Sequence, residues 1–332
     1  MRPFAYTAAT TVPEALAALD RGARPLAGGT TLYDLMRLEV ETPAAIVGIH
    51  RVAELTEIAR NDRTQELVLG AGARMADAAD HPAVRSACPA LAESLWQAAS
   101  PQLRNMATLG GNLLQRTRCG YFRGGSQYRC NKREPGSGCD AIGGVDTAHA
   151  VLGGSDACIA TYPGDLAVVL IAFDAVVDVV GPHGTRTVPM AELHVGPGTE
   201  PQREHTLAPE ELIRRIRVPL APVMRASTYL KIRPRESYAF ALASAAVGLT
   251  CDGTGTVLDC RIGLGGVATR PWRAADAERT LVGQPLTDDA ARRAGELAFL
   301  GARPGRHNGF KIELGIRTVA EALRIAAGRE AS

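Results

Sequence analysis

The chain has 332 residues, 46% of them apolar, and a formal net charge of +2. This length exceeds what one hydrophobic core usually spans, so we expect two or three domains. The balanced charge gives no indication of a nucleic-acid partner. The first residues contain no apolar signal-peptide core, and no run reaches the roughly 18 apolar residues of a membrane span, so the sequence predicts neither feature. The default compartment is therefore a reducing cytosol.

The first hundred residues alternate between helical and extended patterns. A helix is predicted at Pro13–Asp20, with Thr11 as its N-terminal cap. A short strand at Arg24–Ala27 leads through two glycines and two threonines into a helical pattern at Leu32–Glu39. The other elements predicted in this part are the strands Ala44–Gly48 and Glu66–Gly72 and the helix Ala87–Ala99.

Two glycine pairs could bring the backbone close to a ligand. The first, Gly28-Gly29, lies between a strand and a helix start, where free amides favour an anion such as a phosphate. The second, Gly110-Gly111, lies between Thr108 and Asn112. A lone pair of this kind is more often a tight turn than a phosphate site. A loose dinucleotide pattern at Gly263–Ala268 is rejected, because a proline follows where its helix should run.

The second half of the chain changes character near Ser227. Before it, Asp165 precedes an apolar helix at Leu166–Phe173 and could be only its N-cap. A hairpin at 175–188 and a strand at Leu212–Val218 follow, separated by a loop rich in proline and glycine at 196–211. After Ser227, strands precede helices, which is typical of an α+β domain: the hairpin Ala241–Cys251 and Thr256–Gly265, then helices Trp272–Leu281, Asp288–Leu300 and Lys311–Ala327.

Four of the seven cysteines lie close together in the sequence: Cys119, Cys130, Cys139 and Cys158. The first three belong to a long segment of low secondary-structure potential, which in a compact domain is usually functional or disordered. A metal centre could order it. Zinc is a poor match because no C-x2-C pair is present, whereas four thiolates suit a four-iron cluster, although the spacing fits no short ferredoxin run. From spacing alone, a cluster, another metal and incidental cysteines all stay open.

Six basic residues lie among the first three cysteines and should offset thiolate charge and lower the thiol pKa: Arg116, Arg118, Arg123, Arg129, Lys132 and Arg133. The other three cysteines, Cys88, Cys251 and Cys260, are predicted to be small buried residues.

Taken together, these stretches resemble a known family. Leu26–Leu32, Arg104–Leu113, Pro163–Asp165 and Leu264–Ala268 look like the FAD-binding subunits of the molybdenum hydroxylases, the xanthine dehydrogenase family, in order and spacing over nearly the whole chain. The cysteine segment resembles a narrower group, the [4Fe-4S]-containing FAD subunits of bacterial periplasmic aldehyde oxidases. A similar insert occurs in 4-hydroxybenzoyl-CoA reductase, so the segment does not fix the substrate.

The resemblance implies an α+β fold in which a two-lobed PCMH-type FAD-binding domain precedes a C-terminal α/β domain like that of the CO dehydrogenase flavoprotein. The implied boundaries are 1–222 for the FAD-binding domain, with lobes at about 1–55 and 56–222 and a [4Fe-4S] loop at 115–158. The C-terminal domain would cover 223–332.

The resemblance also implies the site residues, position by position. The first lobe would hold the FAD pyrophosphate with Leu26, Ala27, Gly28, Gly29, Thr30, Thr31 and Leu32. The second lobe would line flavin and phosphate with Ala107, Thr108, Gly110, Gly111 and Asn112. Asp165 would bond the polar part of FAD, Ile213 would pack on the isoalloxazine, and Lys231 would approach its rim. Cys119, Cys130, Cys139 and Cys158 would ligate the cluster, and no residue of this chain would be catalytic.

The function implied by the resemblance is electron transfer within a heterotrimer. A molybdopterin-binding large subunit would oxidise an aldehyde, a [2Fe-2S] small subunit would relay electrons, and the FAD of this chain would pass them to dioxygen or a ferredoxin-like acceptor. The cytoplasm is the default location, and the periplasm is reached if a signal-bearing partner is exported with the chain. The alternatives are a stand-alone flavin oxidase, a 4-hydroxybenzoyl-CoA reductase-like flavoprotein subunit, and a binding protein with a structural metal.

Overall fold

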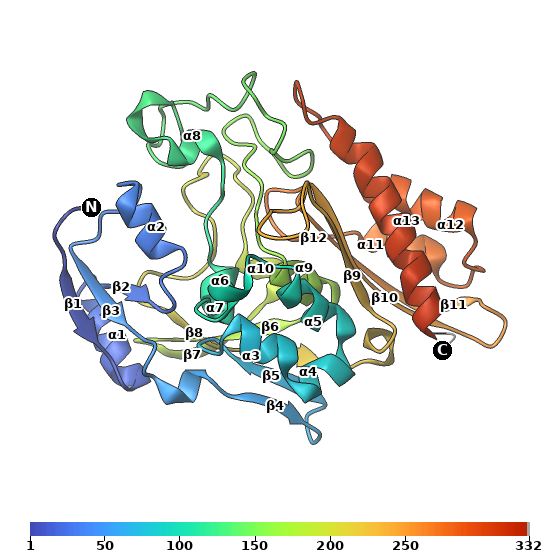
Figure 1. Ribbon diagram of the computed structural model, residues 1–332, viewed down its shortest axis with the longest axis horizontal. Coiled ribbons are helices and arrows are strands. Elements are labelled where there is room, and N and C mark those ends of the chain that lie inside the picture. Colours follow the sequence, from blue (N-terminus) through green and yellow to red (C-terminus); the bar gives the residue numbers. More distant parts are fainter. Residues whose placement is uncertain (331–332) are drawn as a thin grey trace.

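The computed structural model describes residues 1–330 and shows three sheets that follow one another along the chain (Figure 1). The first is a small parallel sheet with the strand order β1-β3-β2. Thr11 caps the first helix, as predicted, by accepting a hydrogen bond from the Glu14 amide at 3.3 Å. The elements of this N-terminal lobe are β1 (Ala5–Ala8), α1 (Val12–Asp20), β2 (Arg24–Leu26), α2 (Leu32–Arg37), β3 (Ala45–Gly48) and the 3-10 turn η1 (Ala53–Leu55).

The second sheet has five strands in the order β4-β5-β8-β6-β7, and every neighbouring pair is antiparallel. Its strands are β4 (Ile58–Asn61), β5 (Glu66–Gly70), β6 (Val176–Gly181), β7 (Gly184–Pro189) and β8 (Leu212–Pro219). The helices of this lobe are α3 (Met75–Asp80), α4 (Pro82–Ala87), α5 (Pro89–Trp96), α6 (Pro101–Arg104), α7 (Leu109–Leu113), α9 (Leu166–Ala172) and α10 (Met190–Leu193).

Every residue of α9 is buried, and the helix packs against α5 and α7 and against two strands of the third sheet, β10 (Ala243–Cys251) and β11 (Val257–Gly265). This placement explains the continuous apolar run of its sequence, because no face of the helix meets solvent. The helix predicted at Ala87–Ala99 is observed as the shorter α5, and a separate helix, α4, ends at Ala87. Pro89 begins α5 and Cys88 between them is extended, with φ −150°.

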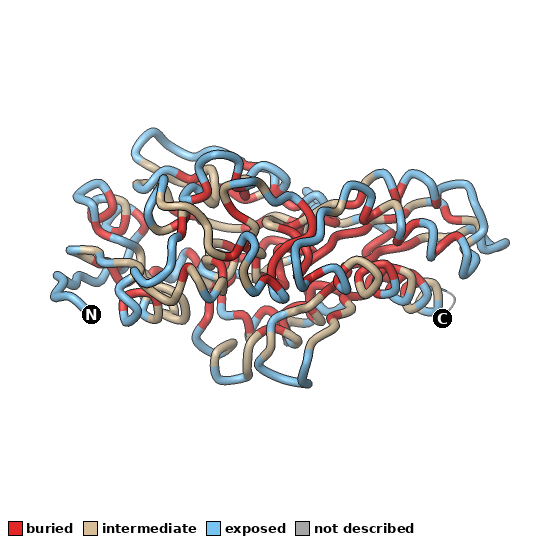
Figure 2. Tube along the Cα trace, turned by 90° about the horizontal axis from the view of Figure 1, so that it is seen from above, coloured by how far each residue is buried: buried red, intermediate tan, exposed pale blue. Residues whose placement is uncertain are grey.

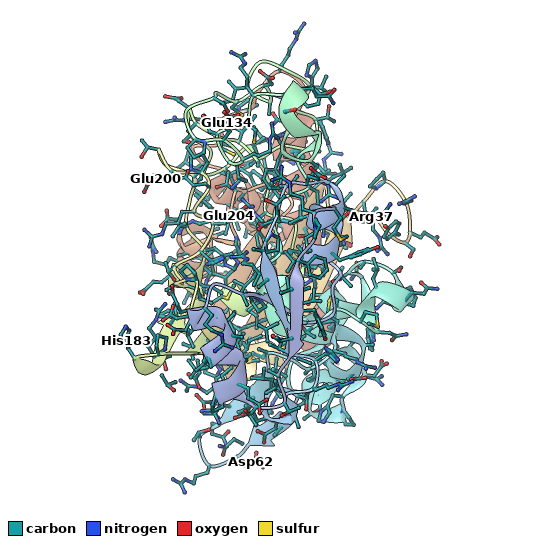
Figure 3. The ribbon with its side chains drawn as sticks, turned by 90° about the vertical axis from the view of Figure 1, so that its left-hand side faces the viewer. Arg37, Asp62, Glu134, His183, Glu200 and Glu204 are labelled. Carbon is teal, nitrogen blue, oxygen red and sulfur yellow. The ribbon has the colours of Figure 1, made fainter. Side chains whose placement is uncertain are left out.

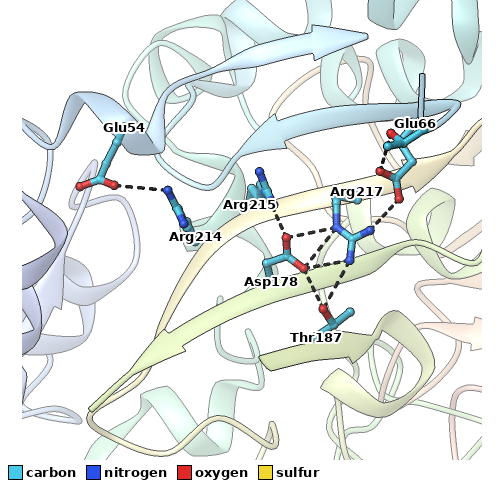
Figure 4. A network of polar contacts seen from close by, with 8 residues as sticks. Glu54, Glu66, Asp178, Thr187, Arg214, Arg215 and Arg217 are labelled. Carbon is cyan, nitrogen blue, oxygen red and sulfur yellow. Dashed lines mark hydrogen bonds and ion pairs between the residues drawn. The ribbon is translucent and has the colours of Figure 1, made fainter. Parts of the chain in front are cut away.

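A charged network fixes the register of the second sheet (Figure 4). The Asp178 carboxylate on β6 is buried and accepts hydrogen bonds from Arg215 at 2.7 Å and from Arg217 at 3.0 Å, both on β8. Arg217 also donates to Glu66 on β5 at 2.6 Å. These bonds lower the pKa of Asp178 below its usual value, although burial by itself raises it. A shift by one residue would turn these side chains to the opposite face, so the network specifies the pairing.

The third sheet, in the order β12-β11-β10-β9, carries three helices (Figure 1). The longest, α13, packs along β10 and β9, and the buried residues run through the interior between sheet and helices (Figure 2). A helix was predicted from Trp272, but Trp272–Arg273 pair with β11 and the helix begins at Ala275. The elements are η3 (Pro222–Met224), β9 (Thr228–Ile232), β10 (Ala243–Cys251), β11 (Val257–Gly265), β12 (Trp272–Arg273), α11 (Ala275–Leu281), α12 (Asp288–Ala298) and α13 (Phe310–Glu330).

The cysteine-bearing segment, residues 115–160, forms a separate layer above these sheets (Figure 1). It contains only α8 (Gly120–Arg123) and the 3-10 turn η2 (Gly125–Gln127), as its composition indicates. Phe122 of this segment packs with Leu35 of α2, so the segment rests partly on the N-terminal lobe. Cys88 and Cys260 are buried, as predicted, whereas Cys251 at the end of β10 is only partly buried.

Candidate functional site: the cleft between the two lobes

A cavity of about 440 Å³ lies between the N-terminal lobe and the second lobe. This volume falls within the roughly 300–1,000 Å³ of small-molecule sites. Of the predicted FAD-binding residues, the lining includes all of Leu26–Leu32, together with Thr108, Gly110, Gly111 and Ile213. The fold therefore brings together two glycine pairs that lie about eighty residues apart in the sequence, with a strand of the second sheet beside them.

Gly28 allows the two lobes to approach this closely, and Gly110 allows close packing within the second lobe. A Cβ atom on Gly28 would lie 1.7 Å from the Met106 carbonyl oxygen, and one on Gly110 would lie 2.8 Å from the Ala71 Cβ. Both separations are shorter than any real contact, so any larger residue would push the backbone segments apart. Gly29 has φ +73°, a conformation that other residues adopt at a cost. Gly28 and Gly110 are therefore required by the packing of the cleft walls, and Gly29 is favoured by its backbone conformation.

The loop of the first lobe presents unused hydrogen-bond donors to the cavity. Within residues 1–330, the backbone amides of Gly28, Gly29 and Thr30 have no protein acceptor. Unpaired amides in a loop that precedes a helix are suited to an anionic group. Gly111 lines the same cavity, and its added Cβ would meet only Thr108 Oγ1 within 4 Å, at 3.0 Å. A side chain at position 111 would therefore enter the cavity rather than collide with its walls.

Charged residues that the sequence analysis did not assign to this site also line the cavity. Glu204 lies in the loop at 196–211 and forms ion pairs with Arg116 and, at 3.0 Å, with Lys132. Figure 3 shows Glu204 below Glu134 of the cysteine-bearing segment. The two cations hold the pKa of Glu204 below its usual value despite its burial. Arg116 also pairs with Glu41 of the first lobe at 2.7 Å, so this network connects three parts of the chain.

Asp165 and Lys231 lie outside the lining of this cavity and bind each other. The Lys231 Nζ donates to Asp165 Oδ2 at 2.8 Å and to the Gln97 carbonyl at 3.0 Å, and the Tyr229 hydroxyl donates to Asp165 Oδ1 at 2.6 Å. Asp165 occupies the N-cap position of α9, but its side chain makes no capping bond. Burial raises the pKa of Asp165, and Lys231 and Tyr229 oppose this rise.

Ala107 and Asn112 adjoin the cavity-lining residues without belonging to the lining themselves. Ala107 is buried, and its carbonyl accepts the Met75 amide at 2.9 Å, which holds the start of α3. The Asn112 Oδ1 is buried and has no hydrogen-bond partner within residues 1–330. An unpartnered buried acceptor next to the cleft is unusual and is what a missing ligand donor would satisfy.

The cysteine-bearing segment brings its four thiols near one another. Cys130 and Cys139 face each other across an antiparallel bridge. Burial, with smaller contributions from the neighbouring Cys130 and Cys158, raises the pKa of Cys119 to about 11. Burial also raises the pKa of Cys158, with smaller contributions from Cys139 and Cys130 in the same direction. All seven cysteines are free thiols.

The pKa values of Cys119 and Cys158 are raised and not lowered as expected, because burial dominates them and most of the six cations pair with other groups. Arg118 and Arg123 pair with Asp34, and Arg129 pairs with Asp140. Arg133 donates to backbone carbonyls of the segment itself. Lys132 lowers the pKa of Cys158, but burial outweighs it.

Residues 1–330 contain no group of three or more His, Cys, Asp or Glu side chains placed to hold a single metal ion. In the same part of the chain, every helix is too short or too polar to cross a membrane.

Two family profiles together match most of the chain. Residues 2–221 match the FAD binding domain in molybdopterin dehydrogenase, and residues 228–324 match the CO dehydrogenase flavoprotein C-terminal domain. These matches confirm the predicted fold class, and the first covers the residues that line the cleft.

Individual proteins show the same relationship. The chain is 43% identical to the aldehyde oxidoreductase FAD-binding subunit PaoB of Escherichia coli K12, over 97% of this chain and 98% of that protein. It is 28% identical to the carbon monoxide dehydrogenase medium chain of Hydrogenophaga pseudoflava, over 98% of both. A solved chain of carbon monoxide dehydrogenase from the same organism superposes with a TM-score of 0.77, at 28% identity, covering 99% of this chain and 98% of that one.

A cleft with unpaired amides, glycine-dependent walls and an unpartnered asparagine fits FAD, and the family matches agree with it. The chain belongs to the FAD-binding subunits of the molybdenum hydroxylase family and is an oxidoreductase subunit.

Proposed function

We propose that this chain is the FAD- and [4Fe-4S]-containing electron-transfer subunit of a molybdenum-dependent aldehyde oxidoreductase. The observation that supports this most strongly is the 43% identity to an aldehyde oxidoreductase FAD-binding subunit over nearly the full length of both proteins. FAD supplies the exchange between single electrons and electron pairs. The chain's own residues bind and orient it: amides of Gly28–Thr30 toward its phosphates, and Ile213 against its ring system.

The proposed partners follow from the family. A molybdopterin-binding large subunit oxidises the aldehyde, and a small subunit with [2Fe-2S] centres delivers the electrons to this chain. The acceptor is dioxygen or a ferredoxin-like protein. Several relatives are named subunits or medium chains, which supports an assembly rather than a chain acting alone. The complex forms in the cytoplasm and reaches the periplasm if a partner carries an export signal.

The cluster is proposed on the four thiols Cys119, Cys130, Cys139 and Cys158. A four-iron cube binds each thiolate at a different iron, so its ligands surround a volume and do not converge on a point as the ligands of one ion do. The thiols share one irregular segment and interact electrostatically, which fits such an arrangement. The raised pKa values of Cys119 and Cys158 mean that metal binding to these two thiols must release protons.

Gly111→Leu tests the FAD site. A leucine at this position would fill part of the cavity, so the purified variant should contain little or no FAD while its thermal unfolding stays close to that of the parent chain. The matched control is Gly253→Leu in the turn between β10 and β11, where an added Cβ meets nothing within 4 Å. Full FAD occupancy in the Gly111 variant would contradict the proposed site.

Single serine variants test the cluster. Each of the four cysteine variants in the segment should lose the [4Fe-4S] signal in low-temperature EPR and most of its iron. Serine at Cys88, Cys251 or Cys260 should leave both unchanged. Full iron in the Cys158→Ser variant would remove that residue from the ligand set, and zinc in protein prepared without air would exclude the cluster.

The absorbance of the purified chain distinguishes the remaining functions. A flavin spectrum with a broad iron–sulfur shoulder is expected. A flavin that turns over an aldehyde without partners would indicate a stand-alone oxidase, and a colourless protein would indicate a binding protein with a structural metal. A flavin–cluster protein whose assembled complex reduces an aromatic acyl-CoA would instead be a 4-hydroxybenzoyl-CoA reductase-like subunit.

A further inference from the structure

His149 contacts the first cysteine of the segment. Its Nε2 lies 3.2 Å from Cys119 Sγ, and the ring is buried. Within residues 1–330, Cys119 is the one thiol of the four that is hydrogen-bonded to another side chain, because the bond to Cys158 Sγ comes from the backbone amide of Ala160. Backbone amides of Tyr121 and Phe122 also point to this sulfur and lower the pKa of Cys119, against the larger effect of burial.

The position of His149 is fixed by a cluster of hydrogen bonds that reaches the C-terminal domain. The His149 amide donates to the Asp146 carbonyl at 2.8 Å, and the His149 carbonyl accepts a hydrogen bond from Asn308 Nδ2 at 3.3 Å. The Asp146 carboxylate accepts the amides of Arg306 and His307, each at 2.7 Å. Loops from two distant parts of the chain therefore hold the backbone on which the imidazole is mounted.

The proton of the imidazole can be assigned from its surroundings. The Nδ1 is buried without a partner, so a proton there would be a buried donor with no acceptor. A ligating cysteine is a thiolate, which accepts hydrogen bonds and cannot donate one. The neutral ring with its proton on Nε2 satisfies both conditions.

We propose that His149 is a positioning residue that donates an Nε2–H···Sγ hydrogen bond to Cys119 and raises the reduction potential of the cluster. This inference rests on the proposed [4Fe-4S] site. Hydrogen bonds to ligating sulfur are among the factors that set cluster potentials, because they stabilise the extra negative charge of the reduced state. Outer partners of this kind also orient the ligand.

The test compares His149→Leu, which lacks the donor, with His149→Gln, which retains an N–H at a similar reach. In EPR-monitored redox titrations of the full chain, the leucine variant should be harder to reduce. We expect a reduced-to-oxidised ratio up to about tenfold lower at a fixed potential, which corresponds to about 59 mV for one electron. The glutamine variant should recover most of the shift. His183→Leu, on the exposed turn between β6 and β7, is the matched control.

A measurement on the parent chain covers the case in which the leucine variant loses its iron. Chain labelled with 15N-histidine should show a histidine nitrogen coupled to the reduced cluster in pulsed EPR, together with an exchangeable proton. A fully loaded leucine variant with unchanged potential would overturn the proposal, as would a parent cluster without histidine coupling. A parent chain that carries no [4Fe-4S] signal would overturn the cluster itself, and the hydrogen bond with it.

Discussion

Breaking the buried pair Asp165–Lys231, which joins the start of α9 to β9, should strongly destabilise the fold. The side chain of Lys231 is fully buried and that of Asp165 is 8% exposed, so solvent does not screen the 2.8 Å contact. Lys231→Met preserves most of the volume but leaves the carboxylate with only Tyr229 as a side-chain donor. Removing one partner of a buried pair costs about 3–5 kcal/mol, because the remaining charge is uncompensated.

The loss should depend on pH in a direction that the geometry fixes. Without Lys231, the pKa of Asp165 in the folded variant rises further above its unfolded value. Such a group stabilises the fold below the unfolded pKa, and this stability is lost as pH rises through the folded pKa. The variant should therefore fall further behind the parent chain at pH 8 than at pH 5.

Urea unfolding at the two pH values measures both effects, and FAD content of the folded variant is recorded in parallel. Asp165→Asn combined with Lys231→Met should recover much of the loss, because no buried charge remains. Arg279→Met, which removes the exposed pair with Asp276, should leave the free energy of unfolding nearly unchanged. A loss in the Lys231 variant below about 1 kcal/mol at pH 8, the range of surface pairs, would refute the reasoning. Loss of FAD at unchanged stability would instead indicate that the pair serves the flavin.

Three further predictions concern the sheet, the cleft and a helix cap. Asp178→Asn should lower the free energy of unfolding at pH 7 and reduce its decline in acid. The lowered pKa of Asp178 gives stability that is present above the unfolded pKa and is lost as pH falls through the folded pKa. Urea titrations at pH 7 and pH 3.5 measure both effects. Gly28→Ala should reduce soluble yield and FAD content together, since the methyl group would overlap the Met106 carbonyl, and normal FAD content would contradict the packing of the cleft. Thr287→Ala should lower the free energy of unfolding by about 1 kcal/mol, because it removes the hydroxyl that accepts the Ala290 amide at 3.1 Å and caps α12. An unchanged midpoint in thermal or urea unfolding would show that α12 does not need this cap.

Much of the secondary structure was predictable because it depends on local chemistry. Thr11 and the following proline define the start of α1, and the turn at 252–255 joins two strands whose alternation is visible in the sequence. The misplaced elements depend on contacts between distant residues. Trp272 carries a helical pattern but pairs with Leu264 of β11, and a pairing partner eight residues earlier is not encoded in the residue itself.

The site shows the same division. The glycine pairs could be recognised because close backbone approach demands glycine, and the structure places both on the cavity. Glu204 could not be recognised from the sequence. Nothing in a loop rich in proline and glycine indicates that Glu204 pairs with Arg116, 88 residues earlier. The effect of the basic residues on the cysteines was predicted from proximity in sequence. It failed because burial dominates the pKa of Cys119 and Cys158, and because Arg118 and Arg123 pair with Asp34 of another lobe.

The anchoring of the cysteine-bearing segment has a consequence for how the protein matures. Its contacts reach Asp34 in the first lobe, Glu204 in the second and Asn308 near the C-terminal end. Contacts between residues so far apart form late, because the intervening chain must be ordered first. During synthesis the four thiols emerge well before Asn308 exists, so they stay open to the solvent and to iron donors until the last helix has docked. We therefore expect the proposed cluster to be inserted while the segment is still open, before the C-terminal part of the chain docks on it.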